Sequence, residues 1–193
     1  LLDTENYVGR DHAGAQSELV LVSLSGVTHL ISGGMGDGGG YVLHDLASGG
    51  RFGTARDVGD PAVLQGDLID ATTVTLPNGA QVIYGGISGG AGIGRINLNA
   101  AGSVQSSYLI RDTGNTHAGQ VTALAQAQLG GNTYLFTASA TDTGITAWRV
   151  GDNSALSPRH SISPETGLWV SNPTALVTAQ AGGADYLILA AAG

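Results

Sequence analysis

The feature that most constrains this chain is an internal repeat of 52 residues. Placing Gly33-Gly34 over Gly85-Gly86 gives an offset of 85 − 33 = 52 without a gap. A second equal step carries Val82-Ile83-Tyr84 onto Tyr134-Leu135-Phe136, and a third carries the start of that run onto Tyr186-Leu187. Steps of equal length indicate about three and a half copies of one structural unit.

Each unit is predicted to form four short antiparallel strands. Apolar positions alternate, or form short solid runs, and are bounded by Gly, Asn, Asp, Ser or Pro, which is typical of strands. Ser25-Gly26 and Asn78-Gly79 separate the first two strands of their units, and such residues tolerate the positive φ of hairpin turns. The predicted units are 15–58, 67–110, 119–162 and an incomplete 171–193, and residues 1–6 align with the fourth strand of a preceding unit.

Four strands in a unit of about fifty residues predict an all-β fold, a β-propeller, whose twisted sheets pack face to face around an axis. Ala71 and Ala123 in the first strands suit a crowded centre, whereas Pro158 lacks an amide hydrogen and suits an exposed outer edge. Residues 1–193 are expected to form one propeller region, a part of a larger ring. Stacked sandwiches, a wide solenoid and a four-bladed ring closed by residues 1–6 are the alternatives.

The charge and composition of the chain narrow its partners. Fifteen acidic residues against seven arginines give a formal net charge of −8, and such a surface repels phosphate, so nucleic acid is not an expected partner. The chain has no Cys, which excludes disulfides and thiolate metal sites. No apolar run approaches about 18 residues, so no membrane span is expected.

One unit also carries a family resemblance. Tyr134-Leu-Phe-Thr-Ala-Ser, then Gly144-Ile-Thr-Ala-Trp-Arg-Val150 and a Gly-Asp-Asn turn, resemble blades of the lactonase-like and YVTN-type seven-bladed propellers. They are similar to blades found beside haemolysin-type calcium-binding repeats in secreted bacterial proteins. The resemblance covers nearly the whole chain, and it implies a secreted or cell-surface location.

The longest predicted connections join the fourth strand of one unit to the first strand of the next, and they carry the candidate site residues. These are Asp112, Asn115, His117, Glu165 and Trp169, joined on the same rim by Asp37 and Asp142 from the connections between second and third strands. Carboxylates, an amide and a His could bind a hard cation such as Ca²⁺ or orient a sugar. Trp169 could stack on a sugar or cover apolar surface at a blade junction.

No residue cluster forms a recognisable catalytic signature, since the chain has no Gly-x-Ser-x-Gly elbow. The sequence therefore favours a non-catalytic module over an enzyme: a rigid disc that binds protein or carbohydrate for adhesion, assembly or ligand capture. The alternative is a metal-dependent hydrolase of the lactonase type with its site at the channel mouth. A third hypothesis is self-association through open strand edges.

Overall fold

The computed structural model of the chain describes residues 15–24, 26–35, 41–58, 63, 68–87, 92–99, 101–168 and 171–192. These residues form fourteen β-strands, and one 3₁₀ turn, Pro164–Thr166, is the only helical segment among them. No helix in these ranges is long and apolar enough to cross a membrane. The predicted all-β class is confirmed.

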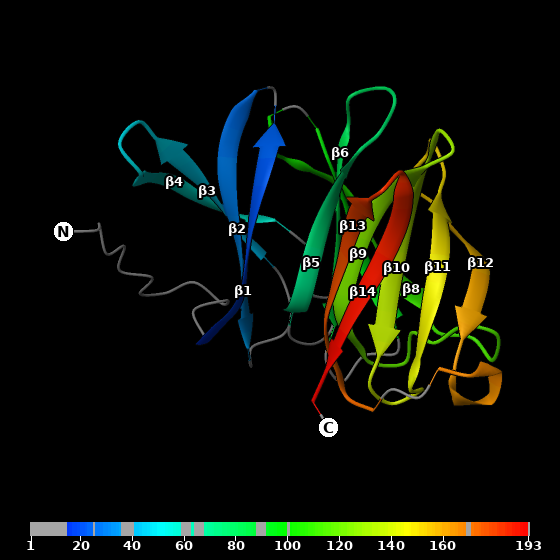
Figure 1. Cartoon of the computed structure of the whole chain (residues 1–193). Helices are drawn as coiled ribbons and strands as arrows, with labels where there is room; N and C mark the ends of the chain where they lie inside the picture. The colour runs from blue at the N-terminus through cyan, green and yellow to red at the C-terminus, as the bar shows by residue number, and fades with distance from the viewer. Residues whose placement is uncertain are drawn as a thin grey trace.

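The strands form four antiparallel sheets, which we call blades 1 to 4 in chain order (Figure 1). Blade 1 contains β1 (Ala15–Leu24), β2 (Val27–Met35), β3 (Tyr41–Ala47) and β4 (Arg51–Val58). Blade 2 contains β5 (Leu68–Thr75), β6 (Gln81–Ile87), β7 (Gly92–Leu98) and β8 (Val104–Arg111). Blade 3 contains β9 (Val121–Leu129), β10 (Asn132–Ser139), β11 (Gly144–Val150) and β12 (Leu156–Ile162). Blade 4 contains β13 (Pro173–Ala181) and β14 (Ala184–Ala191).

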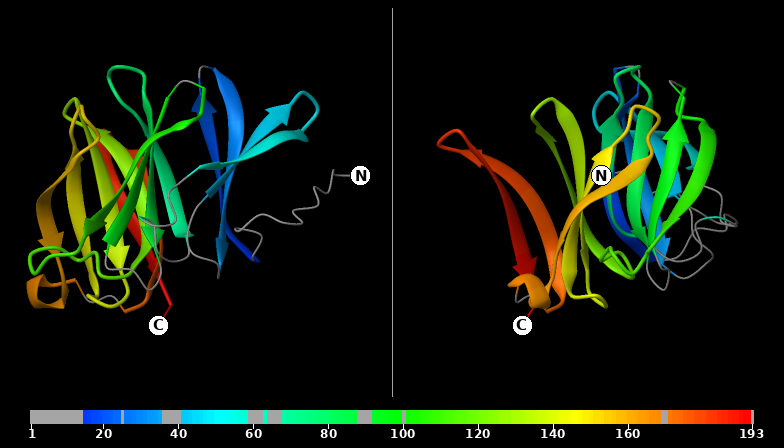
Figure 2. Two further views of the ribbon diagram at one scale, coloured as in Figure 1. Left: turned by 180° about the vertical axis from the view of Figure 1, so that it is seen from behind. Right: turned by 90° about the vertical axis from the view of Figure 1, so that its right-hand side faces the viewer.

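The first strand of each blade is the innermost one. Strands β1, β5, β9 and β13 pack side by side in that order, and the sheets fan out from them (Figure 2). Pro158 lies exposed on β12, the outer strand of blade 3, as predicted. The propeller arrangement is therefore confirmed, and the stacked sandwiches and the solenoid are excluded. Residues 1–6, which a four-bladed closure would need, lie outside the described residues.

Apolar side chains fill the spaces between successive blades. One cluster joins blades 1 and 2 and contains Ile31, Leu43 and Ile83, and a second joins blades 2 and 3. Backbone approaches backbone closely at Gly86, where a Cβ atom would lie 2.6 Å from the carbonyl oxygen of Val121. Glycine is required there because no side chain fits between the blades.

The third strands carry one equivalent buried position, held by His44, Ile96 and Trp148, which are 52 residues apart in sequence. All three side chains are buried, as the repeat predicts for His44. The His44 Nε2 atom lies 3.0 Å from Ser32 Oγ, and Trp148 Nε1 donates a 2.9 Å hydrogen bond to Thr137 Oγ1. A polar ring can occupy this apolar position because the neighbouring strand supplies a hydroxyl partner.

Candidate functional site

All four innermost strands carry a β-bulge near their beginning, close to the long connections between blades. The pairing shifts just before Glu18 in β1 and just before Asp70 in β5. In β9 the residue without a pairing partner is Thr122, and in β13 it is Thr174, so Ala123 and Ala175 follow the bulges of these strands. A bulge re-aims the side chains that follow it, and bulges are frequent at rims and next to active sites.

The residue after the bulge is acidic in two blades and alanine in the other two. Since alanine fills this position in β9 and β13, the bulge itself does not require a carboxyl group. The two acidic residues lie on adjacent innermost strands, because β1 packs against β5. In each blade the residue after the bulge pairs with a residue of the second strand. The four pairs are Glu18–Gly33, Asp70–Gly86, Ala123–Ala138 and Ala175–Ala190.

Asp70 reaches across to the next blade. Its Oδ2 atom accepts a 2.5 Å hydrogen bond from the backbone amide of Leu124 in β9. Burial raises the pKa of Asp70, and the hydrogen bonds from the Leu124 and Ala71 amides offset that effect only in part. This carboxyl group therefore keeps its proton to a higher pH than an ordinary aspartate, which is the property that a general acid needs.

The connection 112–120 runs across the end of blade 3. The carbonyl oxygen of Asn115 accepts a 3.3 Å hydrogen bond from Ser161 Oγ in β12. The backbone amide of His117 donates a 2.8 Å hydrogen bond to Thr146 Oγ1 in β11. The His117 ring packs on Gly144, where a Cβ atom would lie 2.4 Å from its Cγ atom. Both predicted residues are thus held at the same end of the blade.

Glu165 lies at that end too, in the next connection. It is exposed, and its Oε2 atom accepts a 2.5 Å hydrogen bond from Ser163 Oγ. The Ser163 hydroxyl is the largest cause of a lowered pKa of Glu165, and the charge of His117 adds a smaller effect in the same direction. Asn115, His117 and Glu165 therefore share one surface, which we call the rim cluster.

Two other predicted site residues, Asp112 and Asp142, accept hydrogen bonds from the connection 112–120. Asp112 Oδ1 accepts hydrogen bonds from Thr116 Oγ1 and the Ala118 amide, so it organises its own connection. Asp142 Oδ2 accepts a 2.7 Å hydrogen bond from the Gly119 amide, which ties two connections together. Trp169 and Asp37 lie outside the described residues. Within the described ranges no three His, Cys, Asp or Glu side chains are grouped to hold a metal, and Ca²⁺ at Asp37 and Asp142 stays a prediction.

Sequence reasoning overlooked Glu18 and Asp70, although the repeat carried the signal. The 52-residue step leads from Glu18 to Asp70 (70 − 18 = 52), but both lie inside strand patterns and not in the long connections. The next step leads to Thr122, whereas the structural equivalent is Ala123. This difference arises because the turn between β5 and β6 is one residue longer than the turn between β9 and β10. The equivalent pairs that flank these turns are Thr75–Gln81 and Gln128–Thr133.

No protein-family model matches this chain, and no curated protein matches it. Several solved structures do match it. An α-L-arabinofuranosidase (CtGH43) from Clostridium thermocellum ATCC 27405 is 20% identical with a TM-score of 0.55, over 88% of this chain and 59% of that one. A GH43_1 enzyme from Xanthomonas citri, complexed with xylose, is 14% identical with a TM-score of 0.57, over 93% of this chain and 65% of that one.

The Dos1 propeller is a third similar structure, 12% identical with a TM-score of 0.52, over 84% of this chain and 39% of that one. At these identities the likeness establishes the fold, a β-propeller. The chain spans 59% and 65% of the two enzymes. The family resemblance is therefore confirmed at the level of the propeller, and the lactonase-like and YVTN types and the calcium-binding repeats have no support among these structures.

Two expectations are corrected by these neighbours. The prediction of a non-catalytic module rather than an enzyme is contradicted, because two of the propellers that share the architecture are glycoside hydrolases. The same finding contradicts the lactonase-type alternative. The prediction rested on the lack of a contiguous catalytic motif, but a propeller can assemble a site from single residues on separate blades.

Proposed function

We propose that this chain carries the catalytic carboxyl groups of a carbohydrate-active propeller that hydrolyses glycosidic bonds. The observation that carries the proposal is the occurrence of Glu18 and Asp70 at the same post-bulge position of adjacent innermost strands. Glycoside hydrolases use two carboxyl residues that flank the scissile bond. The names of the similar enzymes, an arabinofuranosidase and an enzyme complexed with xylose, support a pentose-containing glycan as the substrate.

The environment of Asp70 assigns its role in this proposal. Asp70, whose pKa burial raises, donates its proton to the glycosidic oxygen as the bond from that oxygen to the anomeric carbon breaks. The second carboxyl residue of such a pair accepts a proton from the water whose oxygen forms the new bond to that carbon, and we assign this role to Glu18. One carboxyl group loses a proton and the other gains one, and exchange with solvent restores the pair.

The rim cluster supplies secondary contacts in this proposal. Asn115, His117 and Glu165 lie on the face where the innermost strands begin, since the connections 112–120 and 163–172 lead into β9 and β13. Their amide, imidazole and carboxylate groups match sugar hydroxyls, which both donate and accept hydrogen bonds. A secreted location belongs to the proposal too, because it would place the protein where polysaccharides accumulate.

Hydrolysis of aryl arabinofuranosides, aryl xylosides and arabinoxylan tests the proposal. Asp70→Asn and Glu18→Gln keep the size of each side chain but remove the proton transfer, so kcat should fall by at least about 100-fold in each. Asp152→Asn is the matched control, because Asp152 is an exposed aspartate in the turn between β11 and β12, on the opposite face. No hydrolysis by the unaltered chain, or full hydrolysis by either variant, would overturn the proposal.

A further inference from the structure

The rim cluster lies on the outer part of blade 3, several strands away from the hub. From the hub outward, the strand order of this blade is β9, β10, β11 and β12. His117 is held at β11 through Thr146, and Asn115 is held at β12 through Ser161. Figure 1 shows the short 3₁₀ coil that carries Glu165 (orange) beyond the end of β12. The cluster is therefore peripheral to the innermost strands.

The separation between the proposed catalytic pair and the rim cluster can be counted in strands. Asp70 Oδ2 accepts its hydrogen bond from the Leu124 amide, so the proposed acid lies at β9. Neighbouring strands are about 4.8 Å apart, which places β11 about 10 Å and β12 about 14 Å from β9. One unit of a pyranose chain is about as long as one strand spacing. The cluster is thus about two to three sugar units away from Asp70.

The connection 112–120 is braced from within, so it presents its exposed groups in a fixed geometry. Asp112 Oδ1 accepts hydrogen bonds from Thr116 Oγ1 at 2.7 Å and from the Ala118 amide at 3.1 Å. Thr116 is buried in the middle of the connection, whereas the neighbouring Asn115 is exposed. A braced segment loses little conformational freedom when it binds a ligand, and this lowers the cost of binding.

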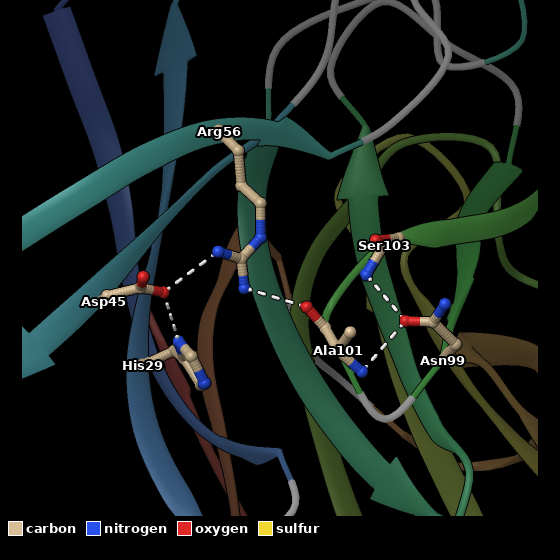
Figure 3. A network of polar contacts seen from close by, with 6 residues as sticks. All are labelled: His29, Asp45, Arg56, Asn99, Ala101 and Ser103. Atoms are coloured by element: carbon tan, nitrogen blue, oxygen red, sulfur yellow. Dashed lines mark hydrogen bonds and ion pairs between the residues drawn. The ribbon is translucent and has the colours of Figure 1, made fainter.

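A second contact between a histidine and a carboxylate shows, by comparison, a network that the protein closes by itself. His29 Nδ1 lies 2.9 Å from Asp45 Oδ1, and Arg56 Nη1 donates a 3.0 Å hydrogen bond to the same oxygen. Figure 3 shows the Arg56 guanidinium continuing to the carbonyl oxygen of Ala101 on blade 2. His29 is buried. Glu165 of the rim cluster is instead exposed, so its carboxylate can be reached by a ligand from solvent.

We infer that the rim cluster is a distal subsite for a glycan main chain, and that the substrate is a polysaccharide or long oligosaccharide rather than a disaccharide. This inference rests on the proposed function. The hydroxyl of Ser163 and the charge of His117 lower the pKa of Glu165, so its carboxylate accepts hydrogen bonds from sugar hydroxyls. A disaccharide at the catalytic pair ends before the cluster, so only chains of about four or more units make these contacts.

The test compares the hydrolysis of xylohexaose with that of xylobiose. His117→Ala and Glu165→Ala each remove a side chain of the rim cluster. In each variant the ratio of kcat/KM for the hexaose to kcat/KM for the biose should fall at least about fivefold, because a lost hydrogen bond weakens binding by about that factor. The change should appear in KM for the hexaose, since the lost contact is equal in the ground state and the transition state.

His29→Ala is the matched control. It removes an imidazole beside a carboxylate, as His117→Ala does, but His29 lies near the start of β2, on the face opposite to the rim cluster. The control should lower the melting temperature and leave the ratio between the two sugars unchanged. An equal fall of the ratio in His29→Ala would assign the effect to general destabilisation and would overturn the inference.

Backbone amide chemical shifts separate this inference from the proposed function, because they need no hydrolysis. In Asp70→Asn, xylohexaose should shift the amides of Asn115 and Glu165 in a saturable way, and xylobiose should not. Hydrolysis with an unchanged ratio in His117→Ala, and no shift at the rim cluster, overturns the inference alone. A saturable shift at the rim cluster without any hydrolysis overturns the proposed function and supports the glycan subsite. The lack of both overturns both.

Discussion

The carboxylate of Asp70 and the backbone amide of Leu124 join the innermost strands of blades 2 and 3 through a 2.5 Å hydrogen bond. The same carboxyl group belongs to the proposed catalytic pair. This one contact therefore holds β5 against β9 and fixes the orientation of the proposed acid. An amide oxygen can accept the same hydrogen bond, whereas a methyl group cannot, so the two roles can be separated by substitution.

Asp70→Ala should destabilise the fold, and Asp70→Asn should do so much less. The alanine variant leaves the buried Leu124 amide without its acceptor, which costs about 1–3 kcal/mol. The asparagine variant keeps an acceptor oxygen at the same place. Urea denaturation of both variants measures the difference. Equal unfolding free energies for the two variants would show that the Leu124 hydrogen bond contributes nothing to blade packing.

The raised pKa of Asp70 predicts a pH dependence of stability. Burial raises this pKa above its ordinary value of 3.8, so the folded state binds a proton more tightly than the unfolded state. The stabilisation by this proton is complete below pH 3.8 and is lost as the pH rises through the folded pKa. The unfolding free energy of the unaltered chain should therefore fall relative to Asp70→Asn across that window. A constant difference between the two proteins would contradict a raised pKa.

Two buried tyrosines should respond differently to loss of their hydroxyl groups. Tyr84 Oη in blade 2 donates a 2.7 Å hydrogen bond to the carbonyl oxygen of Ser154 in blade 3, so Tyr84→Phe should cost about 1–2 kcal/mol. Tyr41 Oη is buried without a hydrogen-bond partner among the described residues. Tyr41→Phe should therefore be neutral or stabilising. Thermal unfolding of the two variants compares them, and a larger loss for Tyr41→Phe would reject this account of the blade interface.

Gly86→Ala should destabilise the interface between blades 2 and 3. The added Cβ atom would lie 2.6 Å from the Val121 carbonyl oxygen, and relieving that contact by a backbone shift costs about 1–3 kcal/mol. Gly114→Ala is the matched control, since a Cβ atom there would have nothing within 4 Å. Chemical denaturation of both variants is the measurement. Equal losses of stability would mean that the blades have room to separate.

The sequence was sufficient to predict the blades, because their signals are local. Period-2 patterns and turn residues such as Asn78-Gly79 recur at one spacing, and each repeat must bury its faces against a neighbour. The predicted connections between fourth and first strands placed Asn115, His117 and Glu165 on one rim, and the structure brings these three together at the end of blade 3.

Contacts between blades could not be predicted in the same way. Asp70 and Leu124 are 54 residues apart, and their contact depends on how two complete sheets pack. Because the turn between β5 and β6 has one extra residue, equivalent positions in β5 and β9 are 53 and not 52 residues apart in sequence (123 − 70 = 53). For that reason a 52-residue alignment of the sequence places Asp70 over Thr122, although Ala123 is the residue that occupies the equivalent position in β9.

The position of a bound glycan tests the central claim most directly. Asp70→Asn should retain a xylo- or arabino-oligosaccharide without cleaving it, so chemical shifts of its backbone amides can be followed during titration with the sugar. The largest changes should fall at the beginnings of β1, β5 and β9, around Glu18, residue 70 and Leu124. Saturable changes confined to the opposite face, at the turns near Gln128 and Asp152, would contradict the proposed carboxyl pair.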